Sequence, residues 1–116
     1  MQRWGREGRY ERLGDEDLIS LIGSDDARAF AAFYDRHSRA AYGIAYRLMN
    51  ERRQAAEDLT QDAFLKMWRS AGDYRPERDS VRTWVLSIVH NRGIEIRSLA
   101  SRRRTQDRVE QSAPKS

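Results

Sequence analysis

The residues best suited to chemistry in this sequence are polar side chains that interrupt an apolar helical pattern. Within "SVRTWVLSIVHNRGIEIRSLASRRR", the apolar side of a predicted helix comprises Val81, Val85, Ile88, Val89, Ile96 and Leu99. Arg92 and Glu95 intrude into that side, Asn91 lies at its edge, and Trp84 flanks them one to two turns earlier. Arginine, asparagine and glutamate can read base edges, and tryptophan offers a flat surface for an unstacked base. The alternative is an Arg92–Glu95 ion pair at the rim of the core with Trp84 buried, and the residues alone leave both open.

Two arginine-containing segments flank this helix. The preceding loop, "GDYRPERDS", contributes Tyr74, Arg75 and Arg78. Arginines near an aromatic residue in an irregular loop suit single-stranded nucleic acid, although a solvated loop is the plainer interpretation. At the other end, Arg102, Arg103 and their neighbour Arg104 suit phosphate contact, which contributes affinity without sequence specificity.

A second candidate surface lies in "AEDLTQDAFLKMW". At 100° per residue, one side of this predicted helix is a core face that comprises Ala56, Leu59, Ala63, Phe64, Met67 and Trp68. The other side comprises Asp58, Gln61, Asp62 and Leu65. This side is either a solvated face with one stray leucine or a protein-binding patch, in which an acidic rim around an apolar anchor suits a basic partner.

These surfaces require helices to position them. Residues 1–14 are charged and glycine-containing, and we expect them to be disordered. Asp15 can cap a short helix, and Ser24 or Asp25 can cap the next. The apolar stripe of that second helix comprises Phe30, Phe33, Tyr34, Ala41, Ile44, Ala45 and Leu48. His37 lies on the stripe, and we expect a hydrogen-bonded core residue there rather than a metal ligand.

The remaining boundaries follow from turn and capping signals. Asn50 ends the second helix or caps the third, and Gly72 and Pro76 stop the third. Ser80 can cap a last helix that begins at Val81 and runs past Leu99. Residues 105–116 resemble a frayed end or the start of a linker. The predicted fold is all-α: a compact bundle of three main helices and a short leading one, over residues 15–104.

Composition narrows the class of protein. The chain has 116 residues, enough for one ordinary domain, with 39% hydrophobic and 34% charged residues. Its net charge is +4, and residues 92–108 carry six arginines against Glu95 and Asp107, a bias typical of proteins that bind polyanions. It contains no cysteine, no apolar run long enough to span a bilayer and no secretory signal, which predicts a soluble cytoplasmic protein. No constellation suggests an enzyme, a metal site or a cofactor.

The order of these segments resembles region two of bacterial RNA polymerase sigma factors, most closely the extracytoplasmic-function (ECF) group. The resemblance rests on "FAAFYDRHSRAAYGIAYRLM", "AEDLTQDAFLKMWR" and "YRPERDSVRTWVLSIVHNRGIEIRSLASRRR", and it covers about Asp15 to Arg104. In that family, region two is a compact helical domain with two working faces. The chain departs at Glu95, where the family usually has aspartate, and at Gly93, which allows a close backbone approach or a kink.

The resemblance implies a partner for each face. The helix matching Ala55–Arg69 would dock on the clamp helices of the largest subunit of core RNA polymerase, which places Asp58, Gln61, Asp62 and Leu65 there. The loop Asp73–Asp79 and the last helix, with Trp84, Asn91, Arg92 and Glu95, would capture flipped bases of the non-template strand of the promoter minus-ten element and so help to melt it. An anti-sigma protein is a further partner that the resemblance implies. Because nothing matches the family's region four, we expect a fragment of a longer protein.

Two other functions are compatible with parts of the sequence. A helical adaptor module would use the acidic patch on a protein partner, with the basic end a solvated, non-functional tail. A nonspecific basic DNA-binding protein would owe its affinity to arginines alone, so changes at Asn91 and Glu95 would leave sequence preference unaltered.

Overall fold

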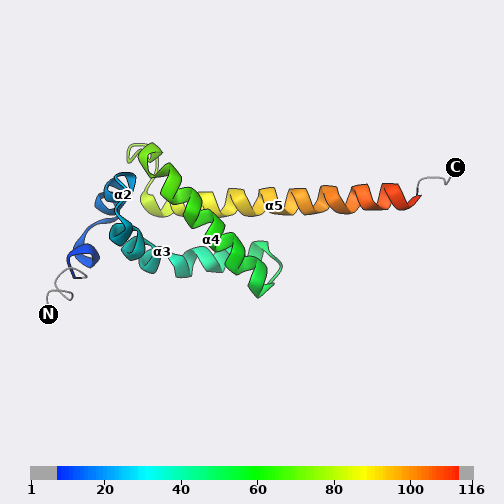
Figure 1. The fold of residues 1–116 in the computed structure, drawn as a ribbon, viewed down its shortest axis with the longest axis horizontal. Helices are drawn as coiled ribbons and strands as arrows, with labels where there is room; N and C mark the ends of the chain where they lie inside the picture. Colours follow the sequence, from blue (N-terminus) through cyan, green and yellow to red (C-terminus); the bar gives the residue numbers. More distant parts are fainter. Residues whose placement is uncertain (1–7, 113–116) are drawn as a thin grey trace.

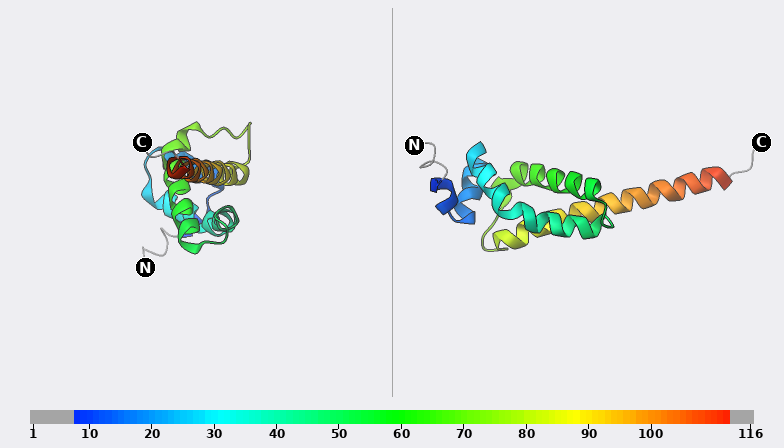
Figure 2. Two further views of the ribbon diagram at one scale, coloured as in Figure 1. Left: turned by 90° about the vertical axis from the view of Figure 1, so that its right-hand side faces the viewer. Right: turned by 90° about the horizontal axis from the view of Figure 1, so that it is seen from below.

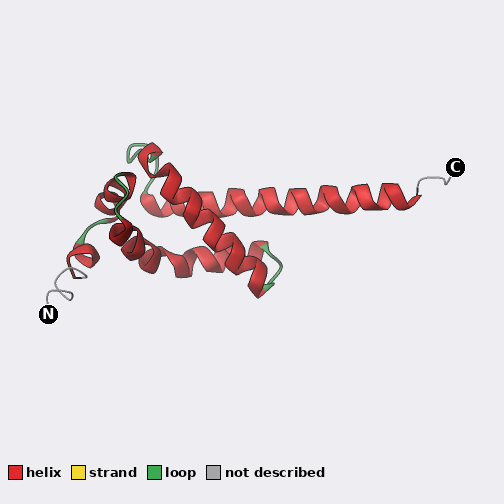
Figure 3. Cartoon of the chain, in the orientation of Figure 1, coloured by secondary structure: helices red, strands yellow, loops and turns green. Residues whose placement is uncertain are grey.

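The chain forms an all-helical domain, as predicted. The computed structural model describes residues 8–112, and all regular secondary structure within them is helical. The first element is a short helical segment, residues 8–12, and four longer helices and a 3₁₀ turn follow it (Figures 1 and 3). Those elements are α2 (Asp15–Gly23), α3 (Ala27–Leu48), α4 (Arg53–Ser70), the 3₁₀ turn η1 (Ala71–Asp73) and α5 (Val81–Ser112).

The core lies where α3, α4 and the first half of α5 meet. Each of these three helices packs against the other two, and α2 closes one end by packing on α3 and η1 (Figure 1). The largest fully buried side chains come from all four helices: Leu18, Phe33, Leu59, Phe64, Met67, Val85 and Val89. Burial of apolar surface at roughly 25 cal/mol per Å² is the main force holding these amphipathic helices together.

The second half of α5 projects far beyond the bundle, as Figure 1 and the right-hand view of Figure 2 show. The molecule therefore measures 72 × 32 × 22 Å along its principal axes, and residues 97–111 are exposed. The sequence suggested a frayed end or linker from residue 105, whereas the helix continues to Ser112. No glycine or proline occurs between Gly93 and Pro114, and the Gln106 amide donates a hydrogen bond to Glu110 one turn later. Residues 113–116 lie outside the described part of the chain.

Capping decides where α3 and α5 begin. The N-cap of α3 is Asp26, whose Oδ1 accepts hydrogen bonds from the backbone N–H groups of Arg28 and Ala29. The sequence favoured Ser24 or Asp25, but Asp25 adopts a left-handed conformation with φ of 66° and belongs to the turn. At α5, Ser80 Oγ accepts from the Thr83 N–H, and the helix begins at Val81 as predicted.

Polar contacts attach the N-terminal segments to α3 and to its N-cap. His37 is buried, as expected, and its Nε2 lies 2.9 Å from Asp15 Oδ1, which also accepts from Arg36. Asp15 is thus the first residue of α2 and a partner for α3, rather than a cap. The Tyr10 hydroxyl donates to Asp26, so residues 8–12 are ordered against the bundle, unlike the irregular segment expected over 1–14. Residues 1–7 lie outside the described range.

None of the helices in residues 8–112 combines the length and the apolar content that crossing a bilayer requires.

Candidate functional site

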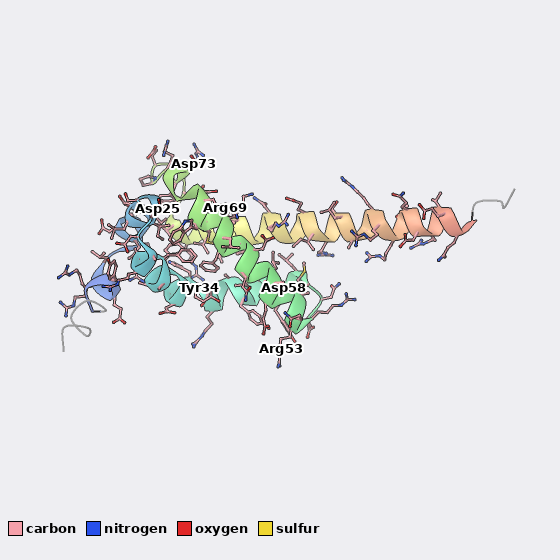
Figure 4. The ribbon with its side chains drawn as sticks, in the orientation of Figure 1. Asp25, Tyr34, Arg53, Asp58, Arg69 and Asp73 are labelled. Atoms are coloured by element: carbon pink, nitrogen blue, oxygen red, sulfur yellow. The ribbon has the colours of Figure 1, made fainter. Side chains whose placement is uncertain are left out.

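The predicted protein-binding patch lies on the outer side of α4. Asp58, Gln61 and Leu65 are exposed, and Leu65 retains 53% of its accessible surface. Figure 4 labels Asp58 and Arg69 toward opposite ends of α4. The amide of Gln54 donates to Asp58 Oδ1 within the helix, which holds that carboxylate on the surface. The patch therefore has an exposed apolar anchor with polar neighbours, the arrangement that suits a protein interface.

Four of the residues that were predicted to bind nucleic acid lie in one line along α5. Trp84, Asn91, Glu95 and Arg102 are separated by seven, four and seven residues, so at 100° per residue they share one side of the helix. The line extends for about 27 Å, from the loop end of the bundle to the projecting half of α5. Asn91, Glu95 and Arg102 are exposed, and Trp84 is half-buried. Arg103 is also exposed, about 100° around the helix from Arg102.

Tyr74 has a structural position in the loop before α5. It retains only 8% of its accessible surface, and its hydroxyl donates a 2.7 Å hydrogen bond to the Asp79 carbonyl oxygen. The Trp84 ring meets the Tyr74 ring edge-on, with centroids 5.6 Å apart. Burial also raises the pKa of the Tyr74 hydroxyl. The buried ring is poorly placed to stack on a base, and instead it holds the loop and supports Trp84.

The two loop arginines differ in their surroundings. Arg75 Nη1 donates to the carbonyl oxygens of Gly72 and Tyr74, so its side chain folds back on its own loop. Arg78 is exposed on the same loop, near the start of α5. Both residues are exposed, and they lie in the loop that leads to the Trp84 end of the α5 line.

An ion-pair network joins the two predicted surfaces. Arg92 of α5 donates from Nε to Asp62 Oδ2 on α4 and from Nη1 to Glu95 Oε1, each at 2.5 Å. The hydrogen bond to Asp62, together with the charge of that carboxylate, raises the pKa of Arg92. The Arg92–Glu95 pair was one of the two alternatives read from the sequence. The contact with Asp62 was not predicted, because no local pattern relates residues that are 30 positions apart.

Gly93 allows α5 to reach the surfaces of α3 and α4. It is buried, and the nearest side chains belong to Leu48 of α3 and Leu59 of α4. The helix continues without interruption through this position, so the glycine serves close approach rather than a kink. This approach places Arg92, the preceding residue, within reach of Asp62.

The described residues show no candidate metal centre, because no group of three or more histidine, aspartate or glutamate side chains within residues 8–112 is arranged to hold an ion.

Comparison with known proteins gives one consistent family. A family model described as Sigma-70 region 2 matches residues 33–108, which include α4 and most of α5. The ECF RNA polymerase sigma factor SigK of Mycobacterium sp. (strain KMS) is 37% identical over 78 residues, which cover 67% of this chain and 40% of that protein. The SigK of Mycobacterium ulcerans (strain Agy99) is 32% identical over 91 residues, covering 78% and 47% respectively. The chain thus spans less than half the length of these curated relatives.

Proposed function

Since the chain belongs to the sigma-70 region 2 family, in its ECF group, we propose that it binds core RNA polymerase through α4 and promoter DNA through α5. The relatives are named as RNA polymerase sigma factors, which supports the polymerase as the protein partner. The proposed action is recognition by binding, and no step in it requires bond chemistry. Both proposed partners are found in the bacterial cytoplasm, where we propose that the chain acts.

The proposed polymerase contact is the outer side of α4. Leu65 is a large exposed apolar side chain beside Asp58 and Gln61, and burial of such an anchor can dominate a protein interface. The family likeness suggests the clamp helices of the largest subunit as the partner. The exposed carboxylate of Asp58 would favour a basic surface on that partner and would accelerate encounter at low salt.

The proposed promoter contact is the line along α5. One observation carries this proposal: a flat aromatic ring, two base-reading side chains and an arginine share one side of a helix at Trp84, Asn91, Glu95 and Arg102. A single strand lying along that side would meet stacking, hydrogen-bonding and phosphate-binding groups in turn. We propose that this strand is the non-template strand of the minus-ten element.

Melting follows from capture of unstacked bases. Flipping a base out of a duplex costs a few kcal/mol of stacking and pairing. Contacts with Trp84, Asn91 and Glu95 would offset this cost most fully where the base fits them, so recognition and strand opening are coupled. Arg78, Arg102 and Arg103 would add affinity that depends on salt concentration rather than on sequence. The family likeness also suggests an anti-sigma protein that covers these faces.

Binding to single strands tests the promoter proposal. The tightest ligand selected from a random single-stranded 15-mer pool should bind at least tenfold better than its scrambled version, measured by fluorescence anisotropy at one stated salt concentration. Asn91→Ala and Glu95→Ala should each reduce this ratio, because each removes a base-reading group. Arg103→Ala should weaken both oligonucleotides about equally. Equal affinity of the unaltered chain for the two oligonucleotides would contradict the proposal and favour a nonspecific binder or an adaptor.

A further inference from the structure

The network of Asp62, Arg92 and Glu95 assigns a different role to one residue of α4. Asp62 lies on the helix that we propose to meet the polymerase, yet its carboxylate is bonded to Arg92 on the helix that we propose to meet DNA. We propose that Asp62 is a positioning residue for base recognition: it fixes the Arg92 guanidinium and, through it, the Glu95 carboxylate. This inference rests on the proposed function, and it moves Asp62 from the polymerase side to the DNA side.

The geometry of the network supports this assignment. A guanidinium is a rigid planar fork, so its two bonds, from Nε to Asp62 and from Nη1 to Glu95, together restrict the plane of the whole group. The bond from Nη1 to Glu95 Oε1 then fixes the orientation of the glutamate carboxylate. Arginine has five N–H donors and a carboxylate has two oxygens, so each side chain retains hydrogen-bonding capacity for a ligand.

The positions of the three residues are consistent with a preorganised reading group. Glu95 belongs to the line of Trp84 and Asn91, and Arg92 lies between that line and α4. The Arg92 and Asp62 side chains retain 32% and 44% of their accessible surface, so the pair is partly shielded from water but still open to a ligand. Side chains that are ordered before binding lose less conformational entropy when a base arrives.

The chain contains a matched control for Asp62. Asp58 is an aspartate on the same side of the same helix, one turn earlier, and its Oδ1 accepts a hydrogen bond from Gln54 of its own helix. Asp58→Asn and Asp62→Asn change the net charge equally. A difference between them in base discrimination therefore reports the bond to Arg92 rather than a general electrostatic effect.

The test measures the affinity ratio of selected to scrambled single strands for four proteins: the unaltered chain, Asp58→Asn, Asp62→Asn and Asp62→Glu. Asp62→Asn should lower the ratio roughly two- to tenfold, because an amide oxygen holds the guanidinium less strongly than a carboxylate, so Arg92 and Glu95 must be ordered more fully on binding. Asp58→Asn should retain the full ratio. Asp62→Glu should retain most of it, because a carboxylate can still reach the guanidinium.

A second measurement follows the bond directly. The Arg92 Nε–H resonance should exchange slowly with solvent in the unaltered chain and in Asp58→Asn, and rapidly in Asp62→Asn. If Asp62→Asn loses this protection but keeps the full affinity ratio, the positioning role is wrong. An equal fall in the ratio for Asp58→Asn and Asp62→Asn would also overturn it. If the unaltered chain itself shows no preference, the proposed promoter function fails at that step, before any variant is compared.

Discussion

Gly93 of α5 lies directly against Leu48 of α3: a Cβ atom added to the glycine would be 2.6 Å from Leu48 Cδ1. It would also be 3.1 Å from Leu59 Cδ2 on α4, so the glycine sits where three helices converge. Glycine in the middle of a helix costs roughly 1 kcal/mol relative to alanine. Because glycine has no side chain, α5 can pack closely on α3 and α4, and this packing offsets the cost. It also brings the polar residues of α5 beside α4.

Gly93→Ala should therefore destabilise the fold, although alanine is the better helix former. Overpacking a tight contact costs about 1–3 kcal/mol, which exceeds the gain in helix propensity of roughly 1 kcal/mol. We expect a net loss of about 1 kcal/mol in the free energy of unfolding, measured by urea denaturation followed by circular dichroism.

Gly43→Ala is the matched control, because Gly43 lies within α3 and a Cβ atom there would meet nothing within 4 Å. This variant should be stabilised by up to about 1 kcal/mol. If Gly93→Ala and Gly43→Ala were both more stable than the unaltered chain, the close contact between α5 and Leu48 would be wrong.

Asp26 should contribute to stability as the cap of α3. Its Oδ1 accepts from two backbone N–H groups that would otherwise lack a partner in the first turn. Asp26→Ala should lower the free energy of unfolding by about 1 kcal/mol, measured from the midpoint of urea denaturation. Ser24→Ala should change it by less than about 0.5 kcal/mol, because Ser24 precedes the cap. A larger effect at Ser24 than at Asp26 would place the start of α3 where the sequence first suggested.

Asp15 should make stability depend on pH in the acidic range. Burial raises the pKa of its carboxyl group, but hydrogen bonds from His37 and Arg36 outweigh this effect, and the pKa is lowered overall. A folded-state pKa below the unfolded value of about 3.9 gives stability that is present above that value and is lost as the pH falls through the folded pKa.

The urea concentration at the unfolding midpoint of the unaltered chain should thus decrease as the pH is lowered below about 4. Asp15→Asn should lower this midpoint at neutral pH and should make its decrease in acid smaller. Some acid dependence should remain, because the Ala29 N–H lowers the pKa of the Asp26 cap in the same way. Asp17→Asn, an exposed change in the same turn of α2, should leave the profile almost unchanged. An identical profile for Asp15→Asn and the unaltered chain would refute the role of Asp15.

The helices and the fold class were predictable because their signals are local. The apolar stripe of residues 30–48 identified α3, and the sequence Ser80–Val81 gave the start of α5. His37 was correctly expected in the core. Such patterns depend on residues within a few turns of one another, which a single sequence displays directly.

The features that sequence reasoning missed depend on contacts between distant segments. Three polar residues precede α3, and only the left-handed backbone of Asp25 makes Asp26 the cap. Tyr74 was expected to stack on nucleic acid from the loop, but it belongs to the buried core, and its ring packs edge-on with Trp84. The bond between Asp62 and Arg92 has no local signature, because it exists only where α4 and α5 meet.

Leu65 gives the most direct test of the central claim that this chain is a polymerase-binding sigma domain. The measurement is the Kd for purified bacterial core RNA polymerase, determined by fluorescence anisotropy with the labelled chain. Leu65→Ala should raise the Kd by roughly tenfold, because it removes the apolar anchor of α4, and it should leave thermal stability unchanged. Leu99→Ala is the control, since Leu99 is equally exposed, at 52%, but lies on the projecting part of α5.

The account predicts saturable binding of the unaltered chain and of Leu99→Ala, with a selective loss for Leu65→Ala. Absence of saturable binding by the folded, unaltered chain would contradict the claim, and so would equal affinity of all three proteins.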